Sequence, residues 1–213
     1  MDLTALKSIQ THLQKNLQPV KLLAVTKSFD LPITQALIEA GIEAIGENRV
    51  EVAEEKFLHL PAVEKHFIGR IQSKKIKRII QLFEVIESVD SNEHLLKIDQ
   101  VAQELDKPVQ VFLQFNISQE PQKAGYSFGQ IDEIRGALNK IHFIQVTGVM
   151  GMASDTPDKA LIRHQFQSLQ KIRDQLQKDF PSISELSMGM SLDYLIAIEE
   201  GATIVRIGKA LIY

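Results

Sequence analysis

The chain has 213 residues, of which 44% are hydrophobic and 24% are charged, a composition typical of globular proteins and unlike that of disordered or collagen-like chains. Its 24 basic and 27 acidic side chains leave a net charge of −3, so a general attraction to nucleic acid or to an anionic membrane surface is not expected. The sequence contains no cysteine, which excludes disulfides, thiolate nucleophiles and cysteine-based metal sites and is typical of a reducing compartment. No segment resembles a signal peptide or a membrane span, and we expect a cytoplasmic protein that folds as one domain over residues 1–213.

Short apolar runs rich in Val, Ile and Phe alternate along the chain with segments whose apolar residues recur at helical spacing. The apolar runs predict eight strands, at residues 21–27, 42–48, 66–70, 85–90, 109–116, 144–150, 185–189 and 203–208. The other segments predict helices near residues 2–15, 32–40, 50–58, 72–82, 92–106, 129–139, 157–179 and 192–200.

Residues that commonly begin or end helices stand at several of these boundaries. Gly41 and Gly201 stand where left-handed helix terminators are expected, and Thr156 precedes a proline as a helix cap would. Ser91 and Ser191 are placed to cap the helices that follow them.

The predicted strands are nearly continuous hydrophobic runs, each followed by a helix, which indicates a parallel sheet covered by helices. Eight such units in one domain length predict an α/β fold of the (β/α)₈ type, a TIM barrel. The alternative is a doubly wound open sheet, but the first strand is not followed by a glycine-rich dinucleotide turn. In a barrel, the residues at the carboxyl ends of the strands carry the function.

Lys27 closes the first apolar run and is expected at the mouth of the barrel. Partial removal from water there would favour the neutral amine, which can attack an aldehyde to form a Schiff base. An ordinary strand-end lysine that extends into solvent is the alternative.

The seventh and eighth predicted strands end in residues suited to binding an anion. Ser187, Met188 and Gly189 bring a hydroxyl group and a close backbone approach just before a predicted helix, and Gly208 offers a second close approach. A tight turn with buried methionines would explain the segment after the seventh strand or Gly208 after the eighth, each taken separately. Their joint placement favours a phosphate site.

Arg206 lies within the last apolar run, two residues before Gly208, so we expect it to be buried or to face inward. A buried guanidinium needs an anionic partner or a ligand acceptor. A structural ion pair with Asp90 or Glu47, the carboxylates at strand ends, competes with a ligand role, and both can hold.

Eight stretches of the chain form a recognisable pattern: LLAVTK (22–27), IGEN (45–48), HFIGRIQS (66–73), SVDS (88–91), QFNIS (114–118), KAG (123–125), GVMGMA (148–153) and LSMGMSLDYLIAIEEGATIVRIG (186–208). In this order the stretches resemble those of the pyridoxal 5′-phosphate (PLP) homeostasis proteins, a family similar to the N-terminal domain of alanine racemase. They span nearly the whole chain, and LSMGMS followed by VRIG at this spacing is highly specific.

The resemblance implies a lone fold-type III barrel that binds PLP without the second domain of a racemase. It implies that Lys27 is the Schiff-base lysine, that Arg206 faces the pyridine nitrogen and that Asn48 lies beside the cofactor. The phosphate cradle that it implies is formed by Ser187, Gly189 and Gly208, with Met188 in the same loop. A cation opposite the ring nitrogen disfavours its protonation and so weakens the electron sink that PLP enzymes use.

The chain departs from the family pattern at three places. Lys209 stands where the family usually has Thr or Ser after VRIG, so a point charge replaces a hydroxyl beside the expected phosphate. Lys74 stands where Asn is common, and Ser28 with Phe29 replaces a continuation that usually contains proline.

Two weaker signals have ordinary explanations. The basic residues Arg70, Lys74, Lys75, Lys77 and Arg78 alternate with isoleucines, as on the solvated face of an amphipathic helix, and no aromatic residues are interleaved for stacking on bases. The six histidines show no close ligand pairing, so a metal site is not expected.

Three functions are consistent with these observations. The first is a non-catalytic, monomeric PLP carrier that serves PLP homeostasis and passes the cofactor to PLP-dependent apoenzymes, with neither nucleic acid nor membrane as a partner. The second is a weak amino-acid racemase that uses Lys27 as its base and Tyr126, Tyr194 or Tyr213 as the opposing group. The third is a regulatory module whose ligand state is sensed by another protein.

Overall fold

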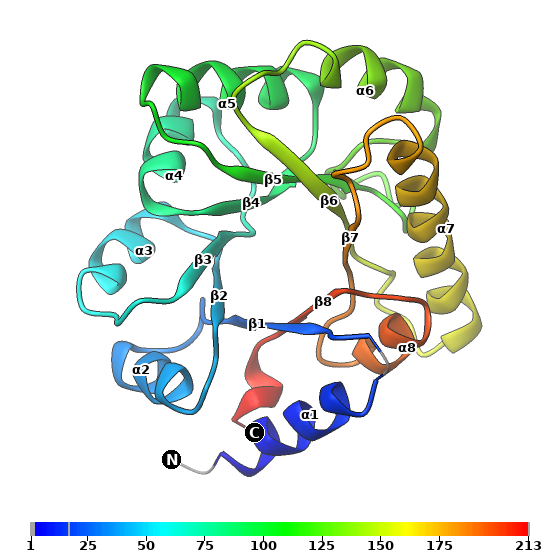
Figure 1. Cartoon of the computed structure of the whole chain (residues 1–213). Helices are drawn as coiled ribbons and strands as arrows, with labels where there is room; N and C mark the ends of the chain where they lie inside the picture. Colours follow the sequence, from blue (N-terminus) through cyan, green and yellow to red (C-terminus); the bar gives the residue numbers. More distant parts are fainter. Residues whose placement is uncertain (1–2, 17, 213) are drawn as a thin grey trace.

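The computed structural model describes residues 3–16 and 18–212 and shows a ring of strands surrounded by helices (Figure 1). Each strand pairs in parallel with the next from β1 to β8, and β8 pairs with β1, so the sheet is a closed barrel. The predicted (β/α)₈ barrel is confirmed, and the doubly wound alternative is wrong because that sheet would be open. Burial of the strands on both faces explains why they read as apolar runs.

All eight predicted strands are present among the described residues, most of them shorter than predicted because the chain leaves the sheet before the polar strand-end residues. The strands are β1 (Lys21–Val25), β2 (Ala44–Glu47), β3 (Glu64–Phe67), β4 (Val85–Val89), β5 (Gln110–Phe115), β6 (Gln145–Gly151), β7 (Glu185–Ser187) and β8 (Ile204–Ile207).

Each predicted helix is also found in the described part of the chain, although the predicted start at Asp2 lies outside the described residues. The helices are α1 (Thr4–Gln14), α2 (Leu31–Glu39), α3 (Val50–Phe57), α4 (Ile76–Leu82), α5 (Asn92–Glu104), α6 (Ile131–Leu138), α7 (Lys159–Gln177) and α8 (Tyr194–Glu199). Short 3₁₀ turns precede α4 and α6 and follow β8: η1 (Ser73–Lys75), η2 (Phe128–Gln130) and η3 (Lys209–Leu211).

The predicted helix boundaries are confirmed at three positions. Gly41 and Gly201 have φ angles of 92° and 85°, the left-handed region that glycine adopts without strain. Ser91 caps α5, because its side chain accepts a hydrogen bond from the His94 N–H.

The predicted caps at Thr156 and Ser191 are wrong. Helix α7 begins two residues later than the proline rule indicates, and the Asp158 carboxylate accepts hydrogen bonds from two N–H groups of its first turn. Helix α8 begins after Asp193, and Ser191 lies in the preceding turn. A carboxylate closer to the helix replaces the predicted cap in the first case, and a longer turn displaces it in the second.

Apolar side chains form two separate clusters, one on each face of the barrel sheet. The larger core lies between the sheet and the helices, and the smaller one lies inside the barrel. The inner cluster consists of Leu23, Ala44, Val85, Phe112, Met150 and Ile204. Because inward positions repeat every second residue, these residues fix which strand-end residues face the barrel mouth.

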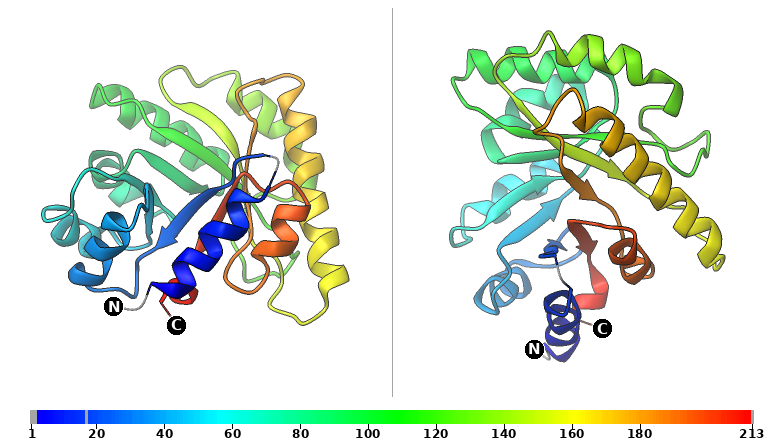
Figure 2. Two further views of the ribbon diagram at one scale, coloured as in Figure 1. Left: turned by 60° about the horizontal axis from the view of Figure 1, so that its bottom comes forward. Right: turned by 45° about the vertical axis from the view of Figure 1, so that its right-hand side comes forward.

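Helix α1 covers the place where the barrel closes. Its buried residues Leu6, Ile9 and Leu13 lie at helical spacing on one face. Both views of Figure 2 show α1 beside η3, which follows β8, so the two ends of the described chain lie together. This packing covers the seam between β1 and β8.

Candidate functional site

The predicted site residues lie within or directly after the carboxyl ends of four neighbouring strands, β7, β8, β1 and β2. The register pairs Ala24 with Ile207 and Val25 with Gly46, which brings Gly208 and Asn48 to either side of the Lys27 turn. The residues that sequence analysis selected therefore lie along one arc of the barrel mouth.

Arg206 and Ser187 form the buried part of this arc. Arg206 is 5% exposed, and its guanidinium donates hydrogen bonds to Ser187 Oγ (Nη1, 2.8 Å) and to the Gly151 carbonyl (Nη2, 2.9 Å). Ser187 in turn donates to Glu87 Oε2 over 2.6 Å. The guanidinium is thereby fixed across the ends of β6, β7 and β8.

The predicted partners of Arg206 were wrong. Its counter-ion is Glu87 of β4, whose Oε2 lies 4.0 Å from Nη1, whereas Glu47 binds Lys56 and Asp90 binds His94. Glu87 was missed because it lies inside a strand rather than at its end. Its inward position could have been read from the two-residue period that relates it to Val85.

The charges of this pair are set by competing effects. Burial lowers the pKa of Arg206, and the charges of Glu87 and Asp193 act in the opposite direction. Burial alone would raise the pKa of Glu87, but His66, Arg206 and Ser187 outweigh it and hold that pKa below its usual value. The site therefore contains a buried guanidinium held by a buried carboxylate.

Gly189 shapes the loop after β7. Its φ angle is 90°, and a Cβ there would lie 2.5 Å from Ala197 Cβ, so a larger residue does not fit. The Gly189 carbonyl accepts a hydrogen bond from the backbone N–H of Arg206 over 2.9 Å. The preceding residue, Met188, is fully buried. The predicted phosphate loop is thus packed on β8 and α8.

Gly208 lies directly after β8, and Lys209 begins η3. A Cβ at Gly208 would lie 3.5 Å from the Val25 carbonyl oxygen, an ordinary van der Waals contact, so packing against the end of β1 does not by itself require glycine here. Lys209 is exposed, which leaves its ammonium able to approach an anion bound there.

Lys27 lies in the turn after β1 and is exposed, which agrees with the alternative of a lysine that extends into solvent rather than with partial removal from water. The turn is held by Lys56 of α3, a residue that sequence reasoning missed. The buried Lys56 ammonium donates to the carbonyls of Thr26 (2.9 Å) and Phe29 (3.0 Å) and to Glu47 Oε1 (2.5 Å). The backbone on both sides of Lys27 is therefore fixed while its side chain remains accessible.

Asn48 follows β2 and is half-buried. A Cβ on Gly69 would lie 2.1 Å from the Asn48 carbonyl oxygen, so only glycine allows the loops after β2 and β3 to pack this closely. This contact holds Asn48 at the barrel mouth.

Two cavities open over the remaining part of the mouth. One of about 380 Å³ is lined by Gly69, Arg70, Asp90 and Gln114, and one of about 400 Å³ lies between the loops after β6 and β7. Lys123 and Met152 line both. Both signs of charge are therefore available to a ligand at this end of the barrel.

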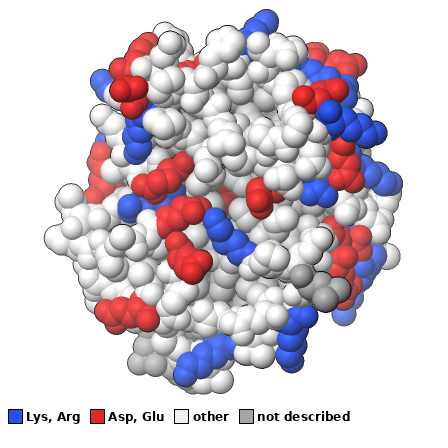
Figure 3. Space-filling model, in the orientation of Figure 1, with Lys and Arg blue, Asp and Glu red and all other residues white. Residues whose placement is uncertain are grey.

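Residues of the basic cluster form ion pairs with acidic residues of a neighbouring helix. Lys75 and Arg78 of the basic cluster pair with Glu51 and Glu54 of α3. Both signs of charge are interspersed on the face that Figure 3 shows. Over residues 3–16 and 18–212, no group of three or more His, Asp or Glu side chains could hold a metal ion, and no helix is both long and apolar enough to cross a membrane.

Comparisons with known proteins identify the family. The family model for the alanine racemase N-terminal domain matches residues 1–213. The pyridoxal phosphate homeostasis protein of Vibrio alginolyticus is 34% identical over 201 residues, covering 91% of this chain and 86% of that protein. That of Escherichia coli is 32% identical over 203 residues, covering 91% and 85%. The chain belongs to the pyridoxal phosphate homeostasis protein family.

Solved structures agree with this family. PipY of Synechococcus elongatus without PLP matches with a TM-score of 0.90 at 30% identity, covering all of both chains. The same protein with PLP bound matches with a TM-score of 0.89 at 31% identity over 98% of each chain. Alanine racemase of Clostridium difficile, at 17% identity and a TM-score of 0.80, shares the fold, and this barrel covers 54% of that chain.

Proposed function

We propose that this chain binds PLP at the carboxyl ends of β7, β8, β1 and β2 and takes part in PLP homeostasis. The observation that carries the proposal is the buried Arg206 guanidinium at the end of β8, which is hydrogen-bonded to Ser187 and paired with Glu87. The names of the relatives and the PLP-bound PipY structure support the cofactor.

The residues of this arc fit the chemical groups of PLP. Lys27 provides an accessible amine for the aldehyde, and their condensation to a Schiff base releases one water. Arg206 provides a fixed cation for the ring nitrogen, and Asn48 lies on the neighbouring strand end. Glycines at 189 and 208 provide loops in which backbone N–H groups can approach the phosphate.

We propose a carrier role without robust catalysis. A cation at the ring nitrogen disfavours ring protonation, and PLP enzymes rely on that protonation to stabilise carbanions. Among the described tyrosines, Tyr126 is buried, and its hydroxyl donates a hydrogen bond to Asn92 Oδ1. Burial also raises the pKa of this hydroxyl. This environment does not suit a racemase acid or base. Tyr213 lies outside the described residues.

The test is the visible spectrum of the purified protein with added PLP. We expect an absorption band of a Schiff base, which borohydride reduces to a stable secondary amine that peptide mass spectrometry locates on Lys27. Lys27→Ala should lose the band and the adduct, whereas Lys77→Ala, at an exposed position on α4, should keep both. A wild-type protein that takes up no PLP would refute the proposal.

The carrier role has separate tests. We expect no Lys27-dependent exchange of amino-acid Cα hydrogen for solvent deuterium, and exchange lost in Lys27→Ala would establish the racemase alternative.

We further propose a cytoplasmic monomer that hands PLP to apoenzymes. Sedimentation of the loaded protein, and activation of an added PLP-dependent apoenzyme across a range of carrier concentrations, test these two points.

A further inference from the structure

A chain of hydrogen bonds continues from the candidate site into the barrel. Beyond Ser187, the second oxygen of Glu87 lies 2.6 Å from His66 Nδ1 of β3. His66 is 1% exposed, and its other nitrogen, Nε2, lies 2.5 Å from Glu64 Oε1. Since both imidazole nitrogens face carboxylates, both donate when His66 is protonated.

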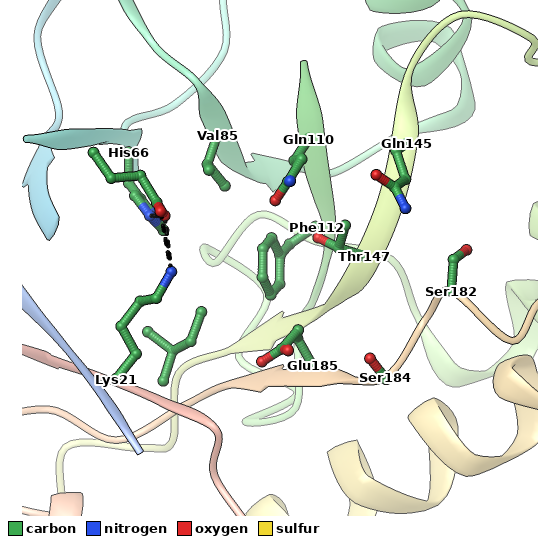
Figure 4. Close-up of a pocket in the computed structure, with 12 residues that line it drawn as sticks. Lys21, His66, Val85, Gln110, Phe112, Gln145, Thr147, Ser182, Ser184 and Glu185 are labelled. Carbon is green, nitrogen blue, oxygen red and sulfur yellow. Dashed lines mark hydrogen bonds and ion pairs between the residues drawn. The ribbon is translucent and has the colours of Figure 1, made fainter. Parts of the chain in front are cut away.

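The chain ends at the opposite end of the barrel. Lys21 Nζ donates to both oxygens of Glu64, over 3.0 and 3.1 Å. Figure 4 shows the Lys21 side chain extending toward His66. The connected side chains are, in order, Arg206, Ser187, Glu87, His66, Glu64 and Lys21.

The charges along this chain alternate in sign. Burial would lower the pKa of His66, but hydrogen bonds and charges from Glu64 and Glu87 outweigh it and raise that pKa. The hydrogen bond from His66, together with Lys21 and against the effect of burial, lowers the pKa of Glu64 to about 2. Each buried charge thus has an opposite charge as its neighbour.

The far end of the chain is open to water. A cavity of about 420 Å³ is lined there by the first residues of seven strands, and His66 also lines it (Figure 4). The side chains of Lys21 and Glu64 are 40% and 37% exposed. His66 can therefore exchange its proton through Glu64 with water at the end of the barrel opposite Lys27.

We propose that Glu87 and His66 are positioning residues of the PLP site and that the proton of His66, exchanged at the amino-terminal end of the barrel, tunes PLP affinity through Glu87 and Arg206. This inference rests on the proposed function. Loss of the proton makes the interior more negative by one charge, which weakens the binding of an anionic ligand beside Arg206.

Five charged side chains from the surrounding strands share the barrel interior with His66, and two of them, Glu64 and Glu87, contact its imidazole. They are Lys21 of β1, Glu64 of β3, Glu87 of β4, Glu185 of β7 and Arg206 of β8. The other inward neighbours, Gln110 and Phe112 of β5 and Gln145 and Thr147 of β6, carry no charge. His66 is the only imidazole among these groups, and its pKa is raised above the ordinary value by Glu64 and Glu87.

The experiment compares PLP affinity from pH 5.5 to 9 in wild type, His66→Gln and His142→Gln. Lys27 chemistry contributes the same pH dependence to all three, so the ratio of affinities isolates His66. We expect the wild-type affinity relative to that of His66→Gln to fall about fivefold as His66 loses its proton. His142 is exposed on the loop before β6, so His142→Gln should follow wild type.

A second measurement needs no variant. Linkage is reciprocal, so PLP binding to the wild-type protein must raise the pKa of His66, which NMR of the imidazole follows in the free and loaded protein. A wild-type protein that binds no PLP would overturn the proposed function. A protein that binds PLP with an unchanged His66 pKa, or with a pH-independent affinity ratio, would overturn this inference alone.

Discussion

Arg206 keeps a positive charge where water is excluded, and two hydrogen-bond acceptors and one carboxylate make this possible. Ser187 and the Gly151 carbonyl accept from its two terminal nitrogens, and Glu87 supplies the counter-charge. The sequence predicted the burial of Arg206, because a charge inside an apolar run must face inward or be paired. It did not predict Glu87, since a single strand sequence does not show which partner lies across the barrel.

Removal of the guanidinium should be costly because it leaves a buried carboxylate without its cation. Arg206→Met is expected to lower the free energy of unfolding by about 3–5 kcal/mol, measured by urea denaturation. In a double-mutant cycle with Glu87→Gln, the double variant should lose less than the sum of the single losses. Strict additivity would mean that Glu87 is not the functional counter-ion of Arg206.

Lys56 illustrates a contact that no helical pattern could reveal. It lies on α3 among charged residues that read as solvated, yet it is 7% exposed and its ammonium binds two carbonyls of the Lys27 turn. These contacts form only when the turn after β1 packs against α3, so the sequence of α3 alone does not predict them.

Lys56→Met should remove the hydrogen bonds that hold this turn and leave the buried Glu47 carboxylate without its cation. We expect a loss of about 3–5 kcal/mol in the free energy of unfolding. PLP binding to Lys27, followed by absorbance, should weaken in the folded fraction of the same variant. Lys77→Met removes an exposed lysine and should change stability by less than about 0.5 kcal/mol. Equal stabilities of the two variants would contradict the bracing role of Lys56.

Among the elements that the structure describes, hydrophobic periodicity located each strand and each α-helix, because burial determines both patterns. A strand covered on both faces must be apolar throughout, and a covering helix must be apolar on one side. The ends were less predictable, since they depend on single hydrogen bonds. Asp158 rather than Thr156 caps α7, because its carboxylate reaches two N–H groups of the first turn.

Gly189 allows the loop after β7 to pack closely against α8. Gly189→Ala places a Cβ 2.5 Å from Ala197 Cβ at a φ of 90°, and should cost about 1–3 kcal/mol of stability and weaken PLP binding. Gly136→Ala, in the exposed part of α6 with open space around it, should instead stabilise by about 0.5–1 kcal/mol. Thermal denaturation compares them, and a harmless Gly189→Ala would show that this loop can move away from α8.

At the scale of the whole molecule, the barrel interior joins its two ends. The amino-terminal end of such a barrel usually contributes stability, and the carboxyl end carries function. Here Glu64 and His66 at the first end are linked by hydrogen bonds through Glu87 to Arg206 at the other. The strand pattern could predict that these residues face inward, but only the closed barrel brings β3, β4, β7 and β8 together around them.

The acid stability of the molecule should therefore depend on Glu64. Its pKa falls from 4.5 to about 2 on folding, so its stabilising contribution is complete above pH 4.5 and is lost as the pH falls toward 2. Glu64→Gln should be less stable than wild type at neutral pH and should lose less stability between these two pH values. Glu55→Gln, at an exposed position on α3, should keep the wild-type profile. Urea denaturation at a series of pH values measures both, and parallel curves for Glu64→Gln and wild type would mean that the His66–Glu64 bond does not stabilise the barrel.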